Sequence, residues 1–394
     1  MKERASVMQA SNVVGQSVTG RYDVAVVGAG ILGLSHAYQA ALRGLRTIVL
    51  DRSPYAQGAS IRNFGMVWPI GQPAGKWHGV AMRSRAMWLD VCREADLWHE
   101  ASGSVHLVTR EDEAEVLREF ARKAPGLGYE VEVWDAAECV RRSPVARRDA
   151  VIAGLYSASE ICVDSPRAIA GFARWLGEKM GVEFRWSAPV TRVEMPAVHL
   201  GDGGVVEAAR VYVCGGTDME QLFPAAYASA GIRKCKLQML AAAAQAGGMR
   251  MGPMVAGGLT LRHYENFAVC ESLRAVKARV AREQPELDRY GIHVMASQHA
   301  SGEFILGDSH EYDEAISPFD SEEIDRLIIE ELRRFVELPD WRITRRWHGV
   351  YAKLSGKPVF TASPAEGVTV VTATGGSGMT MALGIAEQMW EKQL

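Results

Sequence analysis

The chain has 394 residues, 48% of them hydrophobic and 23% charged, and its formal net charge at pH 7 is -3. This length predicts two domains, and the balanced charge argues against nucleic acid or an anionic membrane as a partner. No apolar run approaches the roughly 20 residues that span a bilayer, so we expect no membrane span.

The cysteines and histidines predict a cytoplasmic protein without a metal site. The six cysteines are scattered and form no CxxC pair, which is typical of reduced thiols. The ten histidines form no HExxH motif and no helical pair, so their spacing predicts no metal. Residues 1–20 are small and polar, lack the apolar centre of a signal peptide, and are expected to form an N-terminal extension.

A dinucleotide-binding pattern begins at the first predicted strand, residues 24–27. This strand leads directly into Gly28-x-Gly30-x-x-Gly33 and then into an apolar-faced helix. Gly28 permits a tight turn, Gly30 lets the backbone approach a pyrophosphate, and Gly33 lets helix and strand pack closely. The helix N-terminus presents unpaired N–H groups to the anion.

A second buried strand is predicted at residues 47–50, and it ends in Asp51. Asp51 stands near the roughly 20-residue offset at which a carboxylate meets the adenosine ribose. This adenine-binding half suits both NAD and FAD, so the cofactor stays open at this point. Residues 53–75 are rich in Gly, Pro and Ser, which predicts a loop on the ligand side of the sheet.

The middle of the chain is predicted to be rich in strands. Helices are expected at residues 76–99, 111–123, 166–179 and 320–338, and a further helix at 273–283 interrupts a strand-dominated region from 233 to 306. Within that region we expect a strand over residues 259–270, which carries Arg262, His263 and Tyr264. His293, His299, Asp308 and His310 are expected to be ordinary polar lining.

Strand-to-glycine turns return at Cys214-Gly215-Gly216 and after residues 368–372. The predicted fold is therefore α/β, with a discontinuous Rossmann-like dinucleotide domain and an inserted β-rich (α+β) substrate domain. We place the first domain at residues 21–95, 151–232 and 345–394, and the second at 96–150 and 233–344.

Taken together, these stretches resemble the FAD-dependent amine and amino-acid oxidoreductases of the D-amino-acid oxidase, glycine oxidase and monomeric sarcosine oxidase type. The resemblance implies FAD as the cofactor and a β-rich cap over the flavin. The positions that it implies contact FAD are Gly28, Gly30, Ile31, Leu32, Gly33, Asp51, Arg52, Ser60, Arg62, Asn63, Val190, Cys214, Gly215, Gly216, Gly376, Gly378, Met379 and Thr380.

Two positions depart from the family pattern. Tyr351 stands where an arginine holds the substrate carboxylate in the amino-acid oxidases, and Gly376 stands where glycine oxidase has a second arginine. A tyrosine cannot replace the charge of a bidentate guanidinium. We therefore expect a relocated anion site, and Tyr351, His263, Tyr264 and Lys353 are the candidates that orient the substrate. The chain is also similar to a bacterial branch of this family linked to aminophosphonate breakdown.

The resemblance implies oxidation of the C–N bond of a small primary or secondary amine, with hydride transfer to flavin N5 and hydrolysis of the imine. The substrate is expected to be an aminophosphonate or an N-methylated amine, and oxygen or another acceptor takes the electrons. Three alternatives stay open: an oxidase of α-amino acids of the D-amino-acid, glycine or sarcosine type, an NAD-dependent dehydrogenase, and a structural flavin-binding subunit of an amine dehydrogenase complex.

Overall fold

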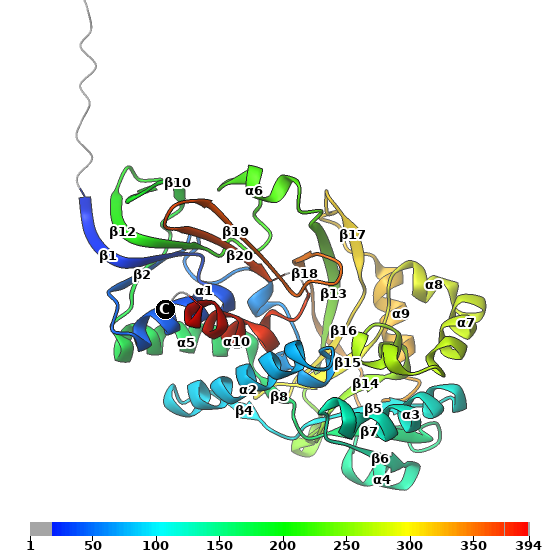
Figure 1. Ribbon diagram of the computed structural model, residues 1–394. Helices are drawn as coiled ribbons and strands as arrows, with labels where there is room; N and C mark the ends of the chain where they lie inside the picture. Colours follow the sequence, from blue (N-terminus) through cyan, green and yellow to red (C-terminus); the bar gives the residue numbers. More distant parts are fainter. Residues whose placement is uncertain (1–17, 374, 393–394) are drawn as a thin grey trace, which may run out of the picture.

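The computed structural model of the chain describes residues 18–373 and 375–392, and two large sheets lie next to each other in it (Figure 1). The eight-stranded sheet takes its strands from the start, middle and end of the chain, whereas the nine-stranded sheet is built mainly from the intervening segments. A small sheet of β3 (Met66–Val67), β4 (His99–Glu100) and β8 (Ile161–Val163) joins them. The predicted α/β architecture is confirmed.

The eight-stranded sheet is parallel in its centre, in the order β20-β12-β1-β2-β9. Those strands are β1 (Val18–Val27), β2 (Thr47–Leu50), β9 (Glu183–Arg185), β12 (Val205–Val213) and β20 (Val368–Ala373). The antiparallel strands are β10 (Val190–Glu194), β11 (Ala197–Leu200) and β19 (Val359–Ala365). Val24 and Val26 are fully buried, as expected of a parallel strand covered on both faces.

Helices cover the face of this sheet that Figure 1 shows below it. They are α1 (Ile31–Leu42), α5 (Ser165–Met180) and α10 (Gly378–Glu391), and α2 (Lys76–Glu94) packs against α10. The alanines of α1, Ala37 and Ala40, are fully buried between its neighbours. At Gly33 the helix α1 contacts the turn after β1 so closely that only glycine fits, because a Cβ there would lie 1.9 Å from the carbonyl oxygen of Gly28.

The nine-stranded sheet forms the second body of the molecule. Its strands are β5 (Ser104–Val108), β6 (Val131–Asp135), β7 (Ala153–Ser157), β13 (Arg233–Ala242), β14 (Met254–Gly257), β15 (Met295–Gln298), β16 (Phe304–Gly307), β17 (Glu311–Asp313) and β18 (Ile343–Lys353). Phe120, Phe267 and Phe304 are fully buried in the core that this sheet shares with its helices.

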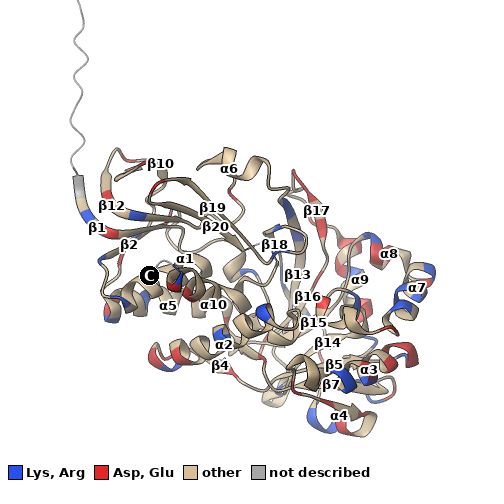
Figure 2. Cartoon of the chain, viewed as in Figure 1, with Lys and Arg blue, Asp and Glu red and all other residues tan. Residues whose placement is uncertain are grey.

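The outer helices of this body carry mixed acidic and basic residues toward solvent (Figure 2). They are α3 (Glu111–Leu127), α4 (Ala136–Arg142), α7 (Leu273–Glu283), α8 (Pro285–Arg289) and α9 (Glu322–Leu332), while the short α6 (Pro224–Ala228) lies against β19. Among the described residues, no helix is both long and apolar enough to cross a membrane.

The strand predicted over residues 259–270 is wrong. The segment forms two 3-10 helices, Gly258–Arg262 and Glu265–Val269. The hydroxyl of Thr260 donates to the carbonyl oxygen of Gly257 at 2.6 Å, and this local bond turns the chain away from an extended path. Leu259 and Leu261 are nevertheless buried, which explains why their alternation resembled a strand.

The strand pairing departs from the predicted domain boundaries at three places. β7 and most of β18 fall within residues 151–232 and 345–394, which we placed in the dinucleotide domain. Both strands instead lie in the nine-stranded sheet. Residues 18–20 belong to β1 rather than to an N-terminal extension, and residues 1–17 lie outside the described part of the chain.

The parallel strands place the ligand-binding turns together. Gly28 follows β1, Asp51 follows β2 and Cys214 follows β12, so all three lie at the carboxyl edge of the sheet. A bridge between Lys353 and Gly375 brings the end of β18 to the same edge. The edge of the first sheet therefore meets the second sheet across a shared space.

Gly33→Ala is expected to destabilise the fold. The added methyl group would have to displace the backbone carbonyl of Gly28, and overpacking of this kind typically costs roughly 1–3 kcal/mol. The melting temperature of the variant should fall by several degrees.

Gly79→Ala is the matched control, because Gly79 also lies in a helix and a Cβ added there would meet no atom within 4 Å. Thermal unfolding of the two variants checks the contact. Equal melting temperatures for Gly33→Ala and the unsubstituted protein would contradict it.

Candidate active site

A cavity of about 430 Å³ lies between the two sheets. The predicted cofactor residues line it, with the exception of Gly33, which packs behind the turn. All four residues predicted to orient the substrate, namely Tyr351, His263, Tyr264 and Lys353, also line it. The structure thus brings the two predicted sets into a single space.

The turn after β1 is shaped for close approach of a ligand. Gly28 has a φ of 101°, and a Cβ there would lie 2.4 Å from the carbonyl oxygen of Cys214. The next residue, Ala29, donates its backbone N–H to the carboxylate of Asp51 at 2.8 Å. Because a carboxylate can accept about four hydrogen bonds, Asp51 retains capacity for the hydroxyl groups of a ribose.

The N-terminus of α1 opens onto this end of the cavity. Gly30, Ile31 and Leu32 line it, and the first turn of the helix carries no acidic residue. The N–H of Ile31 donates to the hydroxyl of Ser60 at 2.9 Å, which fixes the loop after β2 against the helix. The positive end of the helix dipole therefore faces a site suited to a pyrophosphate.

The loop that contains Arg62 and Asn63 is held by internal hydrogen bonds. The Asn63 amide oxygen accepts from the N–H of Gly65 at 2.8 Å and from the hydroxyl of Ser165 at 2.9 Å. Arg52, also predicted to contact the cofactor, forms an ion pair with Asp218 at 2.6 Å, and both residues line the cavity. Asn63 therefore shapes the loop, whereas Arg52 lies at its charged rim.

The C-terminal turn closes the cavity from the other side. The hydroxyl of Thr380 accepts the backbone N–H of Trp68 at 2.9 Å, and the carbonyl oxygen of Met379 accepts the indole N–H of Trp88 at 2.7 Å. These two bonds join α10 to the residue that follows β3 and to α2. They hold the terminal glycine turn near the start of α1, where a Cβ on Gly378 would lie 3.8 Å from the Ile31 side chain.

Tyr351 and Gly376, the two positions that depart from the family pattern, lie in contact. A Cβ on Gly376 would lie 3.0 to 3.1 Å from three atoms of the Tyr351 ring and hydroxyl group. The φ of Gly376 is 70°, which also disfavours a side chain. The tyrosine ring thus occupies the space that a side chain at position 376 would need.

The Tyr351 side chain is buried, and its cross-strand neighbour on β13 is Cys235. Burial raises the pKa of Tyr351 well above its usual range, so the phenol stays neutral and can donate a hydrogen bond. Burial likewise raises the pKa of Tyr264, whose hydroxyl lies 3.2 Å from the sulfur of Met295.

Lys353 supplies a positive charge at the same end of the cavity. It is partly buried and lines the space beside Tyr351. Within residues 18–373 and 375–392, no hydrogen bond or ion pair engages its ammonium group. Lys353 is therefore available to a ligand.

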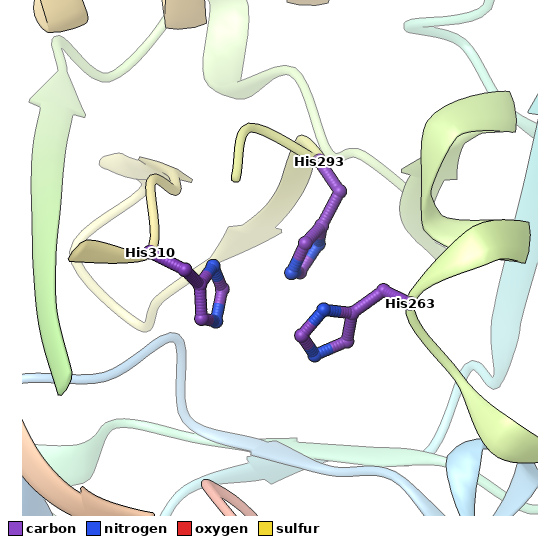
Figure 3. Close-up of side chains that lie close together, drawn as sticks. All are labelled: His263, His293 and His310. Atoms are coloured by element: carbon purple, nitrogen blue, oxygen red, sulfur yellow. The ribbon is translucent and has the colours of Figure 1, made fainter. Parts of the chain in front are cut away.

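The structure also assembles a cluster that sequence spacing did not predict. The rings of His263, His293 and His310 come from three separate segments and point toward one another (Figure 3). Their ligand nitrogens all lie within 4.8 Å of one another, and Asp308 lies beside them. The separations along the chain, 30 and 17 residues, gave no signal that these histidines would meet.

His299, expected to be lining with these residues, lies apart from them. Its ring contacts the carbonyl oxygen of Phe64 at 3.1 Å and Asp164 at 3.8 Å. It does not line the cavity as the structure describes it, whereas His293, Asp308 and His310 do.

Comparison with known proteins agrees with this architecture. N-methyl-L-tryptophan oxidase of Salmonella arizonae is 26% identical over 216 residues, which cover 52% of this chain and 56% of that oxidase. A subunit of the opine oxidase of Rhizobium meliloti is 23% identical over 365 residues, or 86% of this chain and 85% of that protein. The chain thus spans little more than half the length of the first of these relatives.

The fold is similar to the crystal structure of glycine oxidase from Bacillus cereus. The TM-score is 0.74 and the identity 17%, over 95% of this chain and 96% of that one. A family model described as FAD dependent oxidoreductase matches residues 23–391, which removes the NAD-dependent alternative. The glycine cradle, Asp51 and the α1 N-terminus fit the nucleotide half of FAD. The chain belongs to the FAD dependent oxidoreductase family, and its cofactor is FAD.

Proposed function

We propose that this protein oxidises the C–N bond of a small primary or secondary amine that carries an anionic group. The proposed substrate is an aminophosphonate or an N-methylated amine with such a group. Bound FAD supplies the two-electron oxidation. The chain itself binds the anion, orients the amine and excludes water. The imine product is then hydrolysed in solution.

The observation that carries this proposal is the contact between Tyr351 and Gly376. In the related amino-acid oxidases, arginines at these two positions are expected to hold the substrate carboxylate. Here the Tyr351 ring fills the space beside Gly376 instead. The arginines that line the described cavity are Arg52, which is paired with Asp218, and Arg62 on the loop after β2. Arg62 lies near β18, with its guanidinium 3.5 Å from the carbonyl oxygen of His348, but positions 351 and 376 provide no arginine for a bidentate clamp.

Single donors around that end suit a rounder anion. Lys353 offers an ammonium group and the neutral phenol of Tyr351 a hydroxyl donor, and Tyr264 would offer a second hydroxyl in exchange for its hydrogen bond to the Met295 sulfur. Lysine acts as a point charge, whereas arginine matches the planar fork of a carboxylate. A phosphonate has three acceptor oxygens that separate donors can engage together.

The same surroundings favour the reactive form of the amine. An amine must lose its proton before it can be oxidised, and a desolvated site lowers the pKa of an ammonium group. Lys353 adds a like charge that acts in the same direction. No dedicated general base is needed from the chain.

A second candidate function is a flavin-holding subunit within a larger complex. The protein of Rhizobium meliloti that aligns with this chain over most of its length is a subunit of an opine oxidase. In that case the isolated chain would bind FAD without oxidising an amine by itself. An oxidase of α-amino acids is the third candidate.

Anaerobic mixing of the FAD-loaded protein with candidate substrates separates these functions. We expect aminoalkylphosphonates and their N-methyl derivatives to bleach the flavin absorbance, because the donors at Lys353 and Tyr351 suit them. Glycine, D-alanine and sarcosine should bleach it poorly. Fast reduction by α-amino acids would contradict the proposal, and no reduction by any amine would favour the flavin-holding role.

Lys353→Met should raise KM for the anionic amine about ten-fold or more, with a smaller effect on kcat. The loss of a charge-assisted hydrogen bond costs about 1.5–3 kcal/mol, and each 1.4 kcal/mol is a factor of ten. Steady-state kinetics measures the change. Lys179→Met is the control, since Lys179 is exposed at the end of α5, away from the cavity; equal KM values for both variants would count against Lys353.

Tyr351→Phe should weaken binding of the anionic amine by roughly two- to ten-fold, because one neutral hydrogen bond is lost and is worth about 0.5–1.5 kcal/mol. The phenyl ring still covers Gly376, so the FAD content should not change. Perturbation of the flavin spectrum by a non-oxidisable alkylphosphonate gives the dissociation constant.

Tyr156→Phe is the matched control for that measurement. Tyr156 on β7 donates its hydroxyl to the carbonyl oxygen of Ser102 at 3.3 Å, and it does not line the described cavity. If both variants bind the alkylphosphonate as the unsubstituted protein does, the phenol of Tyr351 has no role in anion binding.

A further inference from the structure

His263, His293 and His310 lie in three separate loops, and the fold brings their side chains together in one cluster (Figure 3). His263 follows the 3-10 helix Gly258–Arg262, His293 precedes β15, and His310 follows β16. The ring centroids are 3.7 Å apart for His263 and His293, 4.5 Å for His293 and His310, and 4.7 Å for His263 and His310.

Polar atoms of this cluster are buried without partners among the described residues. Both ring nitrogens of His293 and one carboxylate oxygen of Asp308 form no hydrogen bond there. Each of these two residues is only 5% exposed, and His310 is 7% exposed. Buried polar atoms without partners are costly and rare, and they call for a ligand that the protein atoms do not supply.

The carbonyl oxygen of Gly291 orients the His310 ring, and Asp308 lies near His293 and His310 without a hydrogen bond to either ring. Nδ1 of His310 lies 3.3 Å from the carbonyl oxygen of Gly291. An oxygen of Asp308 lies 3.8 Å from Nδ1 of His293 and 3.9 Å from Nδ1 of His310. A histidine that binds a metal usually donates its other ring N–H to a carboxylate or a backbone carbonyl. That arrangement leaves the Nε2 atoms of His293 and His310 for an ion.

We propose that His263, His293 and His310 bind a divalent transition-metal ion of the zinc class, with Asp308 as the carboxylate that supports the ligand histidines. Three imidazoles suit such an ion, and they leave a fourth tetrahedral position open. That position faces the flavin cavity, because all three histidines line it.

Binding requires the three rings to turn so that their ligand nitrogens come closer together. Zinc–nitrogen distances of about 2.0–2.1 Å place tetrahedral ligand nitrogens about 3.3 Å apart. The ligand atoms of the cluster lie within 4.8 Å of one another, so they approach by at most about 1.5 Å.

The open position gives the ion a role in anion binding, and this role rests on the proposed function. A divalent ion with one carboxylate, together with the ammonium of Lys353, leaves a net positive charge of about two at this end of the cavity. A phosphonate resembles a phosphate monoester, which carries about 1.5 to 2 negative charges at neutral pH. One phosphonate oxygen would occupy the fourth position.

The test measures metal binding on the FAD-loaded, full-length protein. The protein is stripped with a chelator, loaded with Zn²⁺, desalted and analysed for zinc by mass spectrometry, with FAD measured by absorbance. We expect about one zinc per chain. His293→Asn and His310→Asn should each lower the zinc content at least ten-fold while FAD content and melting temperature stay close to those of the unsubstituted protein.

His348→Asn is the control, because His348 pairs with Asp320 on the outer side of β18 and does not line the described cavity. It should keep its zinc. Less than a tenth of a zinc per unsubstituted chain, or full zinc content in both cluster variants, would overturn the metal site. If either variant loses FAD or fails to fold, isothermal titration of the stripped, unsubstituted protein with Zn²⁺ decides: one saturable site supports the proposal and none overturns it.

The role of the ion has a separate readout. Methylphosphonate should bind the zinc-loaded protein at least ten-fold more tightly than the stripped protein. Equal affinity would overturn the anion-binding role and leave the metal site standing. Stoichiometric zinc together with no flavin reduction by aminophosphonates would instead refute the proposed function alone.

Discussion

The close approach of Gly28 to Cys214 is the contact on which the rest of the structure depends. Parallel strands β1 and β12 end side by side, and only a residue without a Cβ fits between the turn and the carbonyl oxygen of Cys214. The turn then directs α1 so that its N-terminus opens onto the cavity, and Asp51 fixes the backbone from β2. Segments from the start and the middle of the chain therefore build the site for the nucleotide half of FAD together.

The opposite end of the cavity is set by side chains of the second sheet rather than by backbone. β18 carries Tyr351 and Lys353 to the terminal glycine turn, where the tyrosine ring covers Gly376. Under the proposed function, a fold common to a large oxidoreductase family would keep its cofactor cradle and change its anion-binding chemistry through few positions. The three histidines extend the same end with nitrogen ligands that the amine-oxidising reaction itself does not require.

The cofactor half could be predicted from the sequence because its signals are local. A buried strand, a glycine turn, a helix and Asp51 follow one another within about 30 residues, the length of one such unit. The histidine cluster could not be predicted, since His263 and His310 meet only through the tertiary fold. The error at residues 259–270 has another cause: a short, buried apolar run looks the same in a strand and in a 3-10 helix until the bond from Thr260 to Gly257 is known.

We propose that one continuous cavity joins the FAD cradle to an anion site at the end of β18. A crystal structure of the FAD-loaded protein with a bound alkylphosphonate tests this claim most directly. The adenosine should lie against Gly28 and Asp51, and the phosphonate should lie within hydrogen-bond reach of Lys353 and Tyr351. A phosphonate bound elsewhere, or a carboxylate held at that end by an arginine, would contradict it.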